Sequence, residues 1–368
     1  MRRIILYTGL LLLLLPGCMD DEAWFEMNQP PLPTGNPAGV FIVNEGNFMY
    51  DNASLSFYDT EDQTVYNHVF YGTNDIPLGD VAQSMTIRDS LGYVVVNNSG
   101  KIIVINVHTM EYAGKITGLT SPRNIHFLSD TKAYVSDLYA RSIAIVDPST
   151  LRVTGSIDVD SHHPRFSRHS TDEMVQYDRF VFTNSWSYDH MILVIDSRTD
   201  RLVDSIEVGK QPTSLVIDRY NKIWTLTDGG YPGSPDGHEA PALHRINATT
   251  REVEKTYLFD EEESPSELAI NGTRDTIYFI NRGIYRHPVQ SGSDPELHIG
   301  SPYEAAHGSG FYGLAVDPAT SEIYVADAID HTRRGMVYRY APDAVPIDSF
   351  RTGIIPGAFC FTEIRPGD

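Results

Sequence analysis

Gly92-Tyr93-Val94-Val95-Val96-Asn97 is followed closely by Ile102-Ile103-Val104-Ile105-Asn106. This pair of apolar segments indicates the fold, because it recurs along the chain. Runs of Val, Ile, Tyr and Phe of this length are typical of buried β-strands. The six intervals between Asn44 and Asp327 give a period of about 47 residues, the length that four short strands and their turns require. The polar residues that end the first segment of each pair are Asn44, Asn97, Ser136, Asn184, Thr227, Asn281 and Asp327.

The two ends of the repeat array complement each other. The first copy, which starts at Val40, has no strand before it, whereas Ile355–Phe361 provides such a strand with nothing after it. We therefore predict an all-β, seven-bladed β-propeller whose ring is closed by the C-terminal strand, which completes the first blade. Closure removes sheet edges that would otherwise pair with other chains. Six or eight blades are the alternative counts.

Turns after the third strand of each repeat follow one pattern. Asp147-Pro148-Ser149-Thr150, Asp196-Ser197-Arg198-Thr199 and Asn247-Ala248-Thr249-Thr250 each begin with Asp or Asn and end with Thr. Side chains of Asp and Asn accept hydrogen bonds from backbone N–H groups two residues on. We interpret these residues as structural.

The N-terminus has the pattern of an exported lipoprotein. Met1-Arg2-Arg3 precedes an apolar run, Ile4–Leu15, that is too short to span a bilayer, and Cys18 follows Leu15-Pro16-Gly17. The prediction is a signal peptide at 1–17, a lipidated Cys18 with a flexible tether at 18–37, and one propeller domain at 38–368. The alternative is an ordinary cleaved signal with a chance Cys. Cys360 is then the other cysteine, and its apolar neighbours indicate a small buried side chain.

The charge balance excludes one class of partner. The chain has 28 Lys and Arg against 49 Asp and Glu, a net charge of −21. Phosphate contacts need a basic surface, so nucleic-acid binding is not expected, and a membrane is reached only through the lipid anchor.

Two sets of loops should share one face of the ring. One set follows the second strand of each blade, and the other is the connection, often with Pro, between blades. These loops are rich in aromatic and amide side chains, which suit a flat ligand with many polar groups. The long segments 229–241 and 329–335 extend the same loops. The candidate ligand-binding residues are Phe48, Asn97, Arg123, Asp137, Tyr139, His163, Arg165, Asn184, Trp186, Tyr188, Tyr231 and Arg282.

The repeat, with turns such as Val194-Ile195-Asp196, resembles YncE-like propellers. With the N-terminal pattern, Tyr7-Thr8-Gly9-Leu10 and the acidic Asp20-Asp21-Glu22, which resembles a Bacteroidetes surface-export signal, the chain is similar to the BtuG family. That resemblance implies a lipid-anchored, surface-exposed outer-membrane protein. It would capture cobalamin or another corrinoid and pass it to a BtuB-like transporter, without a cofactor and without catalysis.

Other functions remain open on the sequence. Such a propeller can bind another nutrient or a surface polymer. A propeller lyase or lactonase would use His, Glu and Asn near the channel, for which the candidates are Glu45, His126, Asn281 and His307. The His-rich segment Ser161–His169 suggests a metal, but no second ligand cluster accompanies it, so no metal site is predicted. No Gly-x-Ser-x-Gly elbow or phosphate-binding Gly loop is present.

Overall fold

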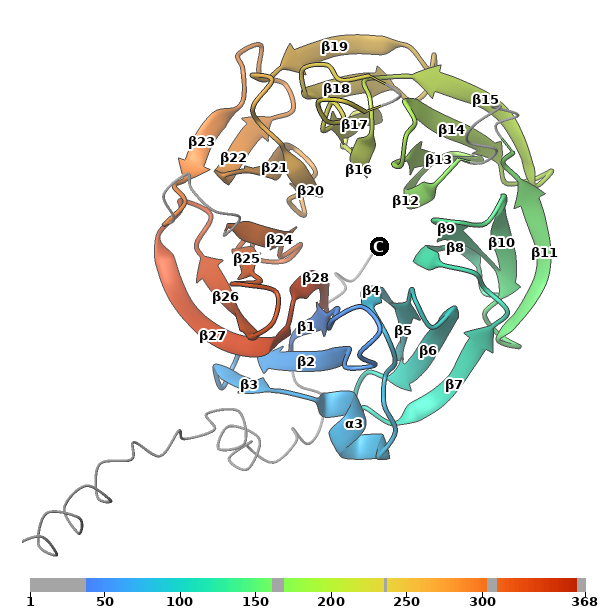
Figure 1. Ribbon diagram of the computed structural model, residues 1–368, viewed down its shortest axis with the longest axis vertical. Helices are drawn as coiled ribbons and strands as arrows, with labels where there is room; N and C mark the ends of the chain where they lie inside the picture. Colours follow the sequence, from blue (N-terminus) through green and yellow to red (C-terminus); the bar gives the residue numbers. More distant parts are fainter. Residues whose placement is uncertain (1–37, 161–168, 235–236, 303–309, 363–368) are drawn as a thin grey trace, which may run out of the picture. The chain divides into compact units, whose positions relative to one another are not determined.

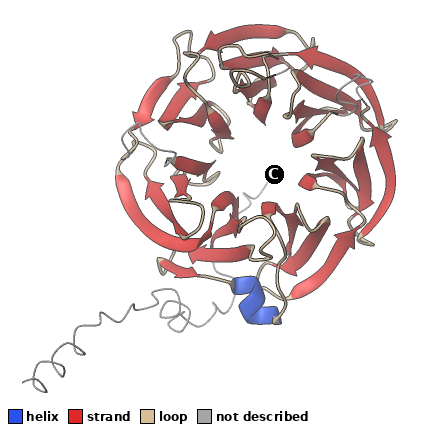
Figure 2. Ribbon diagram, in the orientation of Figure 1, coloured by secondary structure: helices blue, strands red, loops and turns tan. Residues whose placement is uncertain are grey.

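A ring of seven four-stranded antiparallel sheets forms the protein in the computed structural model (Figure 1). The structure describes residues 38–160, 169–234, 237–302 and 310–362. The chain divides into two compact units, Met1–Leu32 and Pro33–Asp368, and every described element belongs to the second. The predicted signal peptide, the lipidation of Cys18 and most of the tether lie outside the described residues. Figure 2 shows that strands make up nearly all of the regular secondary structure, with one short helix beside them.

Blades 2 to 7 each consist of four consecutive strands, with the first at the channel and the fourth at the outside (Figure 1). Blade 2 contains β4 (Ala82–Arg88), β5 (Leu91–Val96), β6 (Lys101–Asn106) and β7 (Tyr112–Thr117), and blade 3 contains β8 (Pro122–Ser129), β9 (Lys132–Asp137), β10 (Ser142–Asp147) and β11 (Arg152–Asp158). Blade 4 contains β12 (Thr171–Tyr177), β13 (Phe180–Ser185), β14 (Met191–Asp196) and β15 (Arg201–Glu207), and blade 5 contains β16 (Pro212–Ile217), β17 (Lys222–Thr227), β18 (Ala242–Asn247) and β19 (Val253–Leu258). Blade 6 contains β20 (Ser266–Ile270), β21 (Thr276–Asn281), β22 (Gly283–Pro288) and β23 (Glu296–Ile299), and blade 7 contains β24 (Phe311–Val316), β25 (Ile323–Asp327), β26 (Arg334–Tyr340) and β27 (Pro346–Ile354).

Blade 1 joins the two ends of the repeat array, as the sequence predicts. Its order is β28 (Pro356–Phe361), β1 (Gly39–Asn44), β2 (Ser54–Asp59) and β3 (Thr64–Tyr66). In the antiparallel pair Phe41 lies opposite Cys360, and the Thr362 amide donates to the Gly39 carbonyl at 2.9 Å. Cys360 is partly buried, and burial raises the pKa of its thiol to about 12. The C-terminal strand therefore closes the ring.

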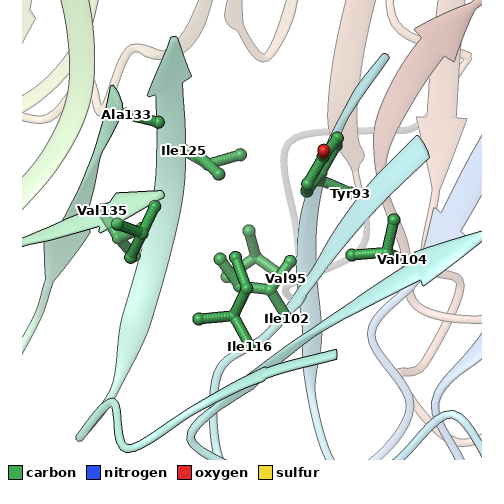
Figure 3. Packing of buried hydrophobic residues seen from close by; sticks show 9 residues of the cluster. Tyr93, Val95, Ile102, Val104, Ile116, Ile125, Ala133 and Val135 are labelled. Atoms are coloured by element: carbon green, nitrogen blue, oxygen red, sulfur yellow. The ribbon is translucent and has the colours of Figure 1, made fainter. Parts of the chain in front are cut away.

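The core lies between neighbouring blades. Strands with few polar residues bury both faces, one against the blade before and one against the blade after. Figure 3 shows one such contact, in which Tyr93, Val95 and Ile102 of blade 2 face Ile125 and Val135 of blade 3. Because every blade is covered on both faces, the seven sheets hold one another in place.

One short helix interrupts the all-β pattern. Helix α3 (Val69–Asn74) follows β3, the three-residue outer strand of blade 1, and buries Val69 and Phe70. The sequence shows no helical periodicity there, because six residues are too few to reveal one. No described helix has the length and apolar character needed to cross a membrane.

Turns on one face of the ring are closed by Asp and Asn side chains, as the sequence indicates. Asp147 Oδ1 accepts a hydrogen bond from the Ser149 amide at 2.9 Å, and Asp196 Oδ1 accepts one from the Arg198 amide at 3.0 Å. Asn247 Oδ1 likewise accepts from the Thr249 amide at 2.9 Å. We call this the bottom face, and the opposite face, with the loops after the second strand of each blade and the connections between blades, the top face.

Candidate functional site

Polar residues at the ends of the second strands attach neighbouring blades to one another. Asn184 is buried and donates to the Pro212 carbonyl at 2.8 Å, and Asn97 donates to the Pro122 carbonyl at 3.0 Å. Asp137, also buried, accepts from the Ser121 amide at 2.8 Å and so holds the connection that leads from blade 2 into its own blade. Sequence reasoning places these three among the ligand contacts. In the structure their polar atoms bond backbone at the start of an inner strand, so they hold the top face together.

Exposed aromatic side chains gather on the top face. Eight aromatic residues of the described chain are exposed, and five of them lie in loops that follow a second strand. Phe48 is 64% exposed, Tyr139 56% and Tyr231 46%, and Tyr50 and Tyr188 complete the set. Of the other three, Tyr71 lies on α3, in the connection between blades 1 and 2 on the same face, Tyr112 begins an outer strand, and Tyr220 lies on the bottom face. We call these five top-face residues, together with the loops that carry them, the rim.

The rim loop of blade 1 is fixed by both neighbouring blades. Its Met49 amide donates to the carboxylate of Asp80, with distances of 2.9 and 3.1 Å to the two oxygens. On the other side the Asn47 amide group donates to the His331 carbonyl at 2.5 Å. A loop held this way presents Phe48 and Tyr50 without a further ordering cost on binding.

Arg123 lies at the mouth of the channel, where it links the rim to the inner strands. Its Nε and Nη2 atoms donate to both oxygens of Asp172 at 3.1 and 2.9 Å, and Nη1 donates to the Gln83 side chain at 2.5 Å. The ring of Trp186, a partly buried residue of the rim loop of blade 4, lies 5.8 Å from the guanidinium carbon, a cation–π contact. Two predicted site residues, Arg123 and Trp186, therefore meet.

The remaining sequence candidates are separate from that contact. Arg282 is exposed in the turn between β21 and β22 of blade 6. His163 and Arg165 lie outside the described residues, as does His307 of the lyase hypothesis. His169, at the end of the His-rich segment, pairs with Asp189. Among the described residues no three His, Cys, Asp or Glu side chains are grouped so as to hold a metal ion.

Every inner strand has a register shift close to its start. The shift places an extra residue on the inner strand, as a β-bulge does, in all seven blades. A β-bulge changes the direction in which nearby side chains point. Here it affects the side chains of the first residues of each inner strand. The mouth ring is our name for the second residue of each inner strand, counted in blade 6 from Pro265, which directly precedes β20. Its members are Gly357, Gln83, Arg123, Asp172, Thr213, Ser266 and Tyr312.

Glu45 fills the gap in the mouth ring at Gly357, the member that has no side chain. A Cβ on Gly357 would lie 2.5 Å from Glu45 Oε1, so the carboxyl group occupies the space that a side chain would take there. Tyr312 of blade 7 donates to the same oxygen at 2.9 Å. The ring thus has an Arg–Asp pair on one side and a Tyr–Glu pair on the other.

The next residues along the inner strands, which we call the latch ring, bond one blade to the next. Ser84 donates to the Arg123 carbonyl at 2.7 Å, and Glu173 Oε2 accepts from the Leu215 amide at 2.6 Å. Ser214 accepts from the Leu268 amide at 3.1 Å. The equivalent residue is Glu267 in blade 6, which lies on β20. The seven members are Ala358, Ser84, Asn124, Glu173, Ser214, Glu267 and Gly313.

Three carboxyl groups at the mouth, those of Glu45, Glu173 and Glu267, have raised pKa values. Burial raises the pKa of Glu267 to about 8, and the nearby carboxylates of Glu45 and Asp172 add to the shift. Burial also raises the pKa of Glu173 well above its ordinary value, and that of Glu45 less strongly because Tyr312 and Arg123 oppose it. The mouth is therefore acid-rich, with Arg123 as the cation that acts on all of these carboxyl groups.

Sequence reasoning overlooked most of this site. Asp172, Glu173, Glu267 and Tyr312 were not among the candidates, and Glu45 was considered only for a lyase. A usable signal exists, because the connections between blades are followed by the inner strands in every repeat. Aligning Pro122, Pro212 and Pro265 puts the following residues in the two rings.

The chain belongs to the family described as a domain of unknown function, DUF5074, whose sequence model matches residues 38–340. No curated protein sequence matches the chain.

Solved structures confirm the architecture. A quinoprotein alcohol dehydrogenase-like protein from Bacteroides thetaiotaomicron superposes with a TM-score of 0.67 at 15% identity, covering 89% of this chain and 78% of that one. Hydrazine synthase from Kuenenia stuttgartiensis gives a TM-score of 0.61 at 14% identity over 76% of this chain and 89% of that one. The computationally designed protein Ika8 gives 0.55 at 10% identity over 88% and 91%. Similarity at these identities establishes the propeller fold and no shared activity.

Proposed function

We propose that this propeller is a binding protein that captures cobalamin or another corrinoid on its top face. The observation that carries the proposal is the rim, where five of the eight exposed aromatic residues of the described chain lie in loops on one face of the ring. Rings of Tyr and Phe pack well on a wide, flat ligand, while their hydroxyl groups and nearby amides bond its polar fringe. The rim loop of blade 1 is already held by both neighbouring blades, which supports tight binding.

We also propose that Cys18 carries a lipid anchor, that the protein faces the outside of an outer membrane, and that it passes its ligand to a BtuB-like transporter there. The support is the order of Met1-Arg2-Arg3, the apolar run Ile4–Leu15, and Cys18 with its acidic neighbours. Palmitate labelling of the wild type and of Cys18→Ala tests the anchor. Labelling of the wild type alone is expected, and equal labelling of both would contradict it.

Calorimetric titration with cyanocobalamin tests the binding proposal directly. The chain from Ala23 onward retains every described residue, and we expect one ligand per chain with submicromolar affinity. An absence of binding would reject the corrinoid proposal and leave the fold unaffected.

Blade 5 provides a matched pair of variants for that titration. Tyr231 and Tyr220 are 46% and 45% exposed, but Tyr231 lies in the rim and Tyr220 in a turn of the bottom face. Tyr231→Ala should weaken cyanocobalamin binding about tenfold, equivalent to roughly 1.4 kcal/mol, and Tyr220→Ala should leave it unchanged. Equal losses in both variants would show that the ligand does not bind at the rim.

A further inference from the structure

A cleft of about 210 Å³ lies on the top face of blade 1, between the rim loop of that blade and α3. The buried side chains of Leu55, Phe70 and Leu78 form its apolar wall. Pro77 and Tyr71, both exposed, border it on the side of α3. The cleft is therefore apolar inside and has apolar residues at its edge.

The connection between blades 1 and 2 builds one side of the cleft. It runs over residues 67–81, whereas the connections into blades 3 and 5 are only 118–121 and 208–211. The additional residues form α3, whose two flanking residues, His68 and Asp75, both have a left-handed backbone with φ 53°. Such conformations cost free energy in residues other than glycine, and they persist where the surrounding structure enforces them, often at functional sites. The insertion is thus a feature of this blade with an enforced shape.

Neighbouring parts of the ring hold both sides of the cleft in place. The rim loop is bonded to Asp80 and to the His331 carbonyl. On the other side Asn74 of α3 donates to the Met110 carbonyl at 2.9 Å and accepts from the Tyr112 amide at 2.8 Å, which ties the helix to blade 2. A cleft whose sides are already fixed loses little conformational entropy when it is filled.

Exposed apolar side chains flank the cleft. Met49 of the rim loop and Tyr71 and Ile76 of the insertion are all exposed. Exposed apolar residues that lie together mark a surface that another molecule covers. Other exposed apolar residues, such as Leu258 and Leu297, lie singly on the outer strands of different blades.

Exposed charges beside the cleft are negative. Asp51 lines the cleft and Asp75 ends α3, and both are exposed. The cations nearby are less accessible, since Lys101, which interacts with Asp51, is partly buried and Arg334, which is bonded to His68, is buried. A partner with lysine or arginine beside an apolar side chain would be complementary, whereas a second copy of this acidic chain would bring like charges.

We infer that the cleft, with Met49, Tyr71 and Ile76 around it, is a docking surface for a protein partner that inserts one apolar side chain flanked by basic residues. The apolar side chain fills the cleft, and the basic residues approach Asp51 and Asp75. An apolar anchor in a preformed pocket is the kind of contact that dominates the affinity of protein interfaces. The inference goes beyond the proposed function, because it does not depend on what the rim captures.

Three short peptides test the inference on the unmodified protein. Acetylated and amidated lysine–phenylalanine–lysine is compared with glutamate–phenylalanine–glutamate and with lysine–alanine–lysine by saturation-transfer NMR at low ionic strength, where exposed charges are little screened. We expect the first peptide to bind at least tenfold more tightly than either of the others. Equal binding of the acidic peptide or of the alanine peptide, or no binding of any peptide, overturns the inference.

A matched pair of surface variants locates the binding. Ile76→Lys places a positive charge beside the cleft and should weaken binding of the lysine–phenylalanine–lysine peptide at least fivefold. Val345→Lys makes an equivalent change at an exposed aliphatic residue in a turn of the bottom face, and it should leave the affinity unchanged. Equal losses in the two variants would overturn the inference.

Sedimentation of the unmodified protein at high concentration tests the other occupant. A monomer is expected, and a dimer that Ile76→Lys dissociates would overturn the inference in favour of a second copy. Titration of Ile76→Lys with cyanocobalamin keeps the two proposals apart. Ile76 lies outside the rim, so the variant should bind that ligand like the wild type, and failure of both to bind it would leave the peptide result standing.

Discussion

The two faces of the ring use the same strands but differ in what lies between them. Bottom-face turns are closed by side chains of Asp and Asn, such as Asp147 and Asp196, which bond the turn backbone. On the top face some loops, such as the one between β17 and β18, are much longer. Others carry exposed aromatic residues such as Tyr139, and the same face holds an acid-rich channel mouth. The bottom face satisfies its own polar groups, whereas the top face keeps apolar surface and acceptors available, which is where a rigid scaffold places function.

Removing the strand that both faces depend on should have the largest effect. A chain that ends at Ile355 lacks β28, so blade 1 loses its inner strand and β1 exposes an open edge. We expect no cooperative unfolding transition in urea and aggregation at micromolar concentration. A truncated chain that unfolds at the wild-type midpoint would contradict the view that closure stabilises the ring.

Acid should destabilise the protein through the core between the faces. His287 is fully buried against Trp224 and Tyr257, and neither of its ring nitrogens has a hydrogen-bond partner among the described residues. Burial lowers its pKa to about 4, so the unfolded chain binds its proton more tightly. The contribution to stability is complete above pH 6.5 and is lost as the pH falls toward 4, on the order of 3 kcal/mol.

His287→Phe isolates that contribution. The variant should lose less stability than the wild type between pH 7 and 4.5, as measured by the urea midpoint at each pH. Glu267 changes the stability in the opposite direction. Because its pKa is raised in the folded protein, the free energy of unfolding falls as the pH rises from about 4.5 to 8. If the variant lost as much stability between pH 7 and 4.5 as the wild type, His287 would not be a cause of the acid sensitivity.

Asn184 tests the comparison of the two faces, because it lies on the top face but has a structural role. Asn184→Ala removes the bond to the Pro212 carbonyl and leaves that buried oxygen without this donor, at a cost of about 2 kcal/mol. Denaturant unfolding measures the loss. Affinity for cyanocobalamin, expressed per folded molecule, should change less than in Tyr231→Ala, and a larger change would make Asn184 part of the binding surface.

The smallest effect is expected on the bottom face. Asp147→Ala removes the acceptor of the Ser149 amide in an exposed turn, so the loss of stability should be about 1 kcal/mol or less. Thermal unfolding provides the measurement, and cyanocobalamin affinity should equal that of the wild type. A variant that binds less tightly would contradict the assignment of ligand binding to the top face alone.

The fold was predictable because the same local pattern repeats along the chain and so indicates which distant segments pair. Seven copies of an apolar pair, and a C-terminal segment that lacks a partner, were enough to place Pro356–Phe361 beside Gly39–Asn44. The rim was predictable in outline, since aromatic residues between strands such as Tyr139 and Tyr231 have no sheet to pack in. The α3 helix was missed because six residues show no period.

The roles of individual top-face residues depended on tertiary structure. Asn97, Asp137 and Asn184 occupy loop-edge positions in the sequence like those of Tyr139 and Trp186, but only the packed ring shows their polar atoms bonded to neighbouring backbone.

The sequence by itself determined the number of blades, the strands and the way the ring closes, because strand formation and blade packing follow from local hydrophobic patterns. Only the tertiary structure brought Glu45, Arg123 and Glu267 to one channel mouth. These residues come from blades 1, 3 and 6, far apart along the chain. Their pKa values depend on burial and on charges that approach across the ring, and neither quantity is written in the spacing of residues.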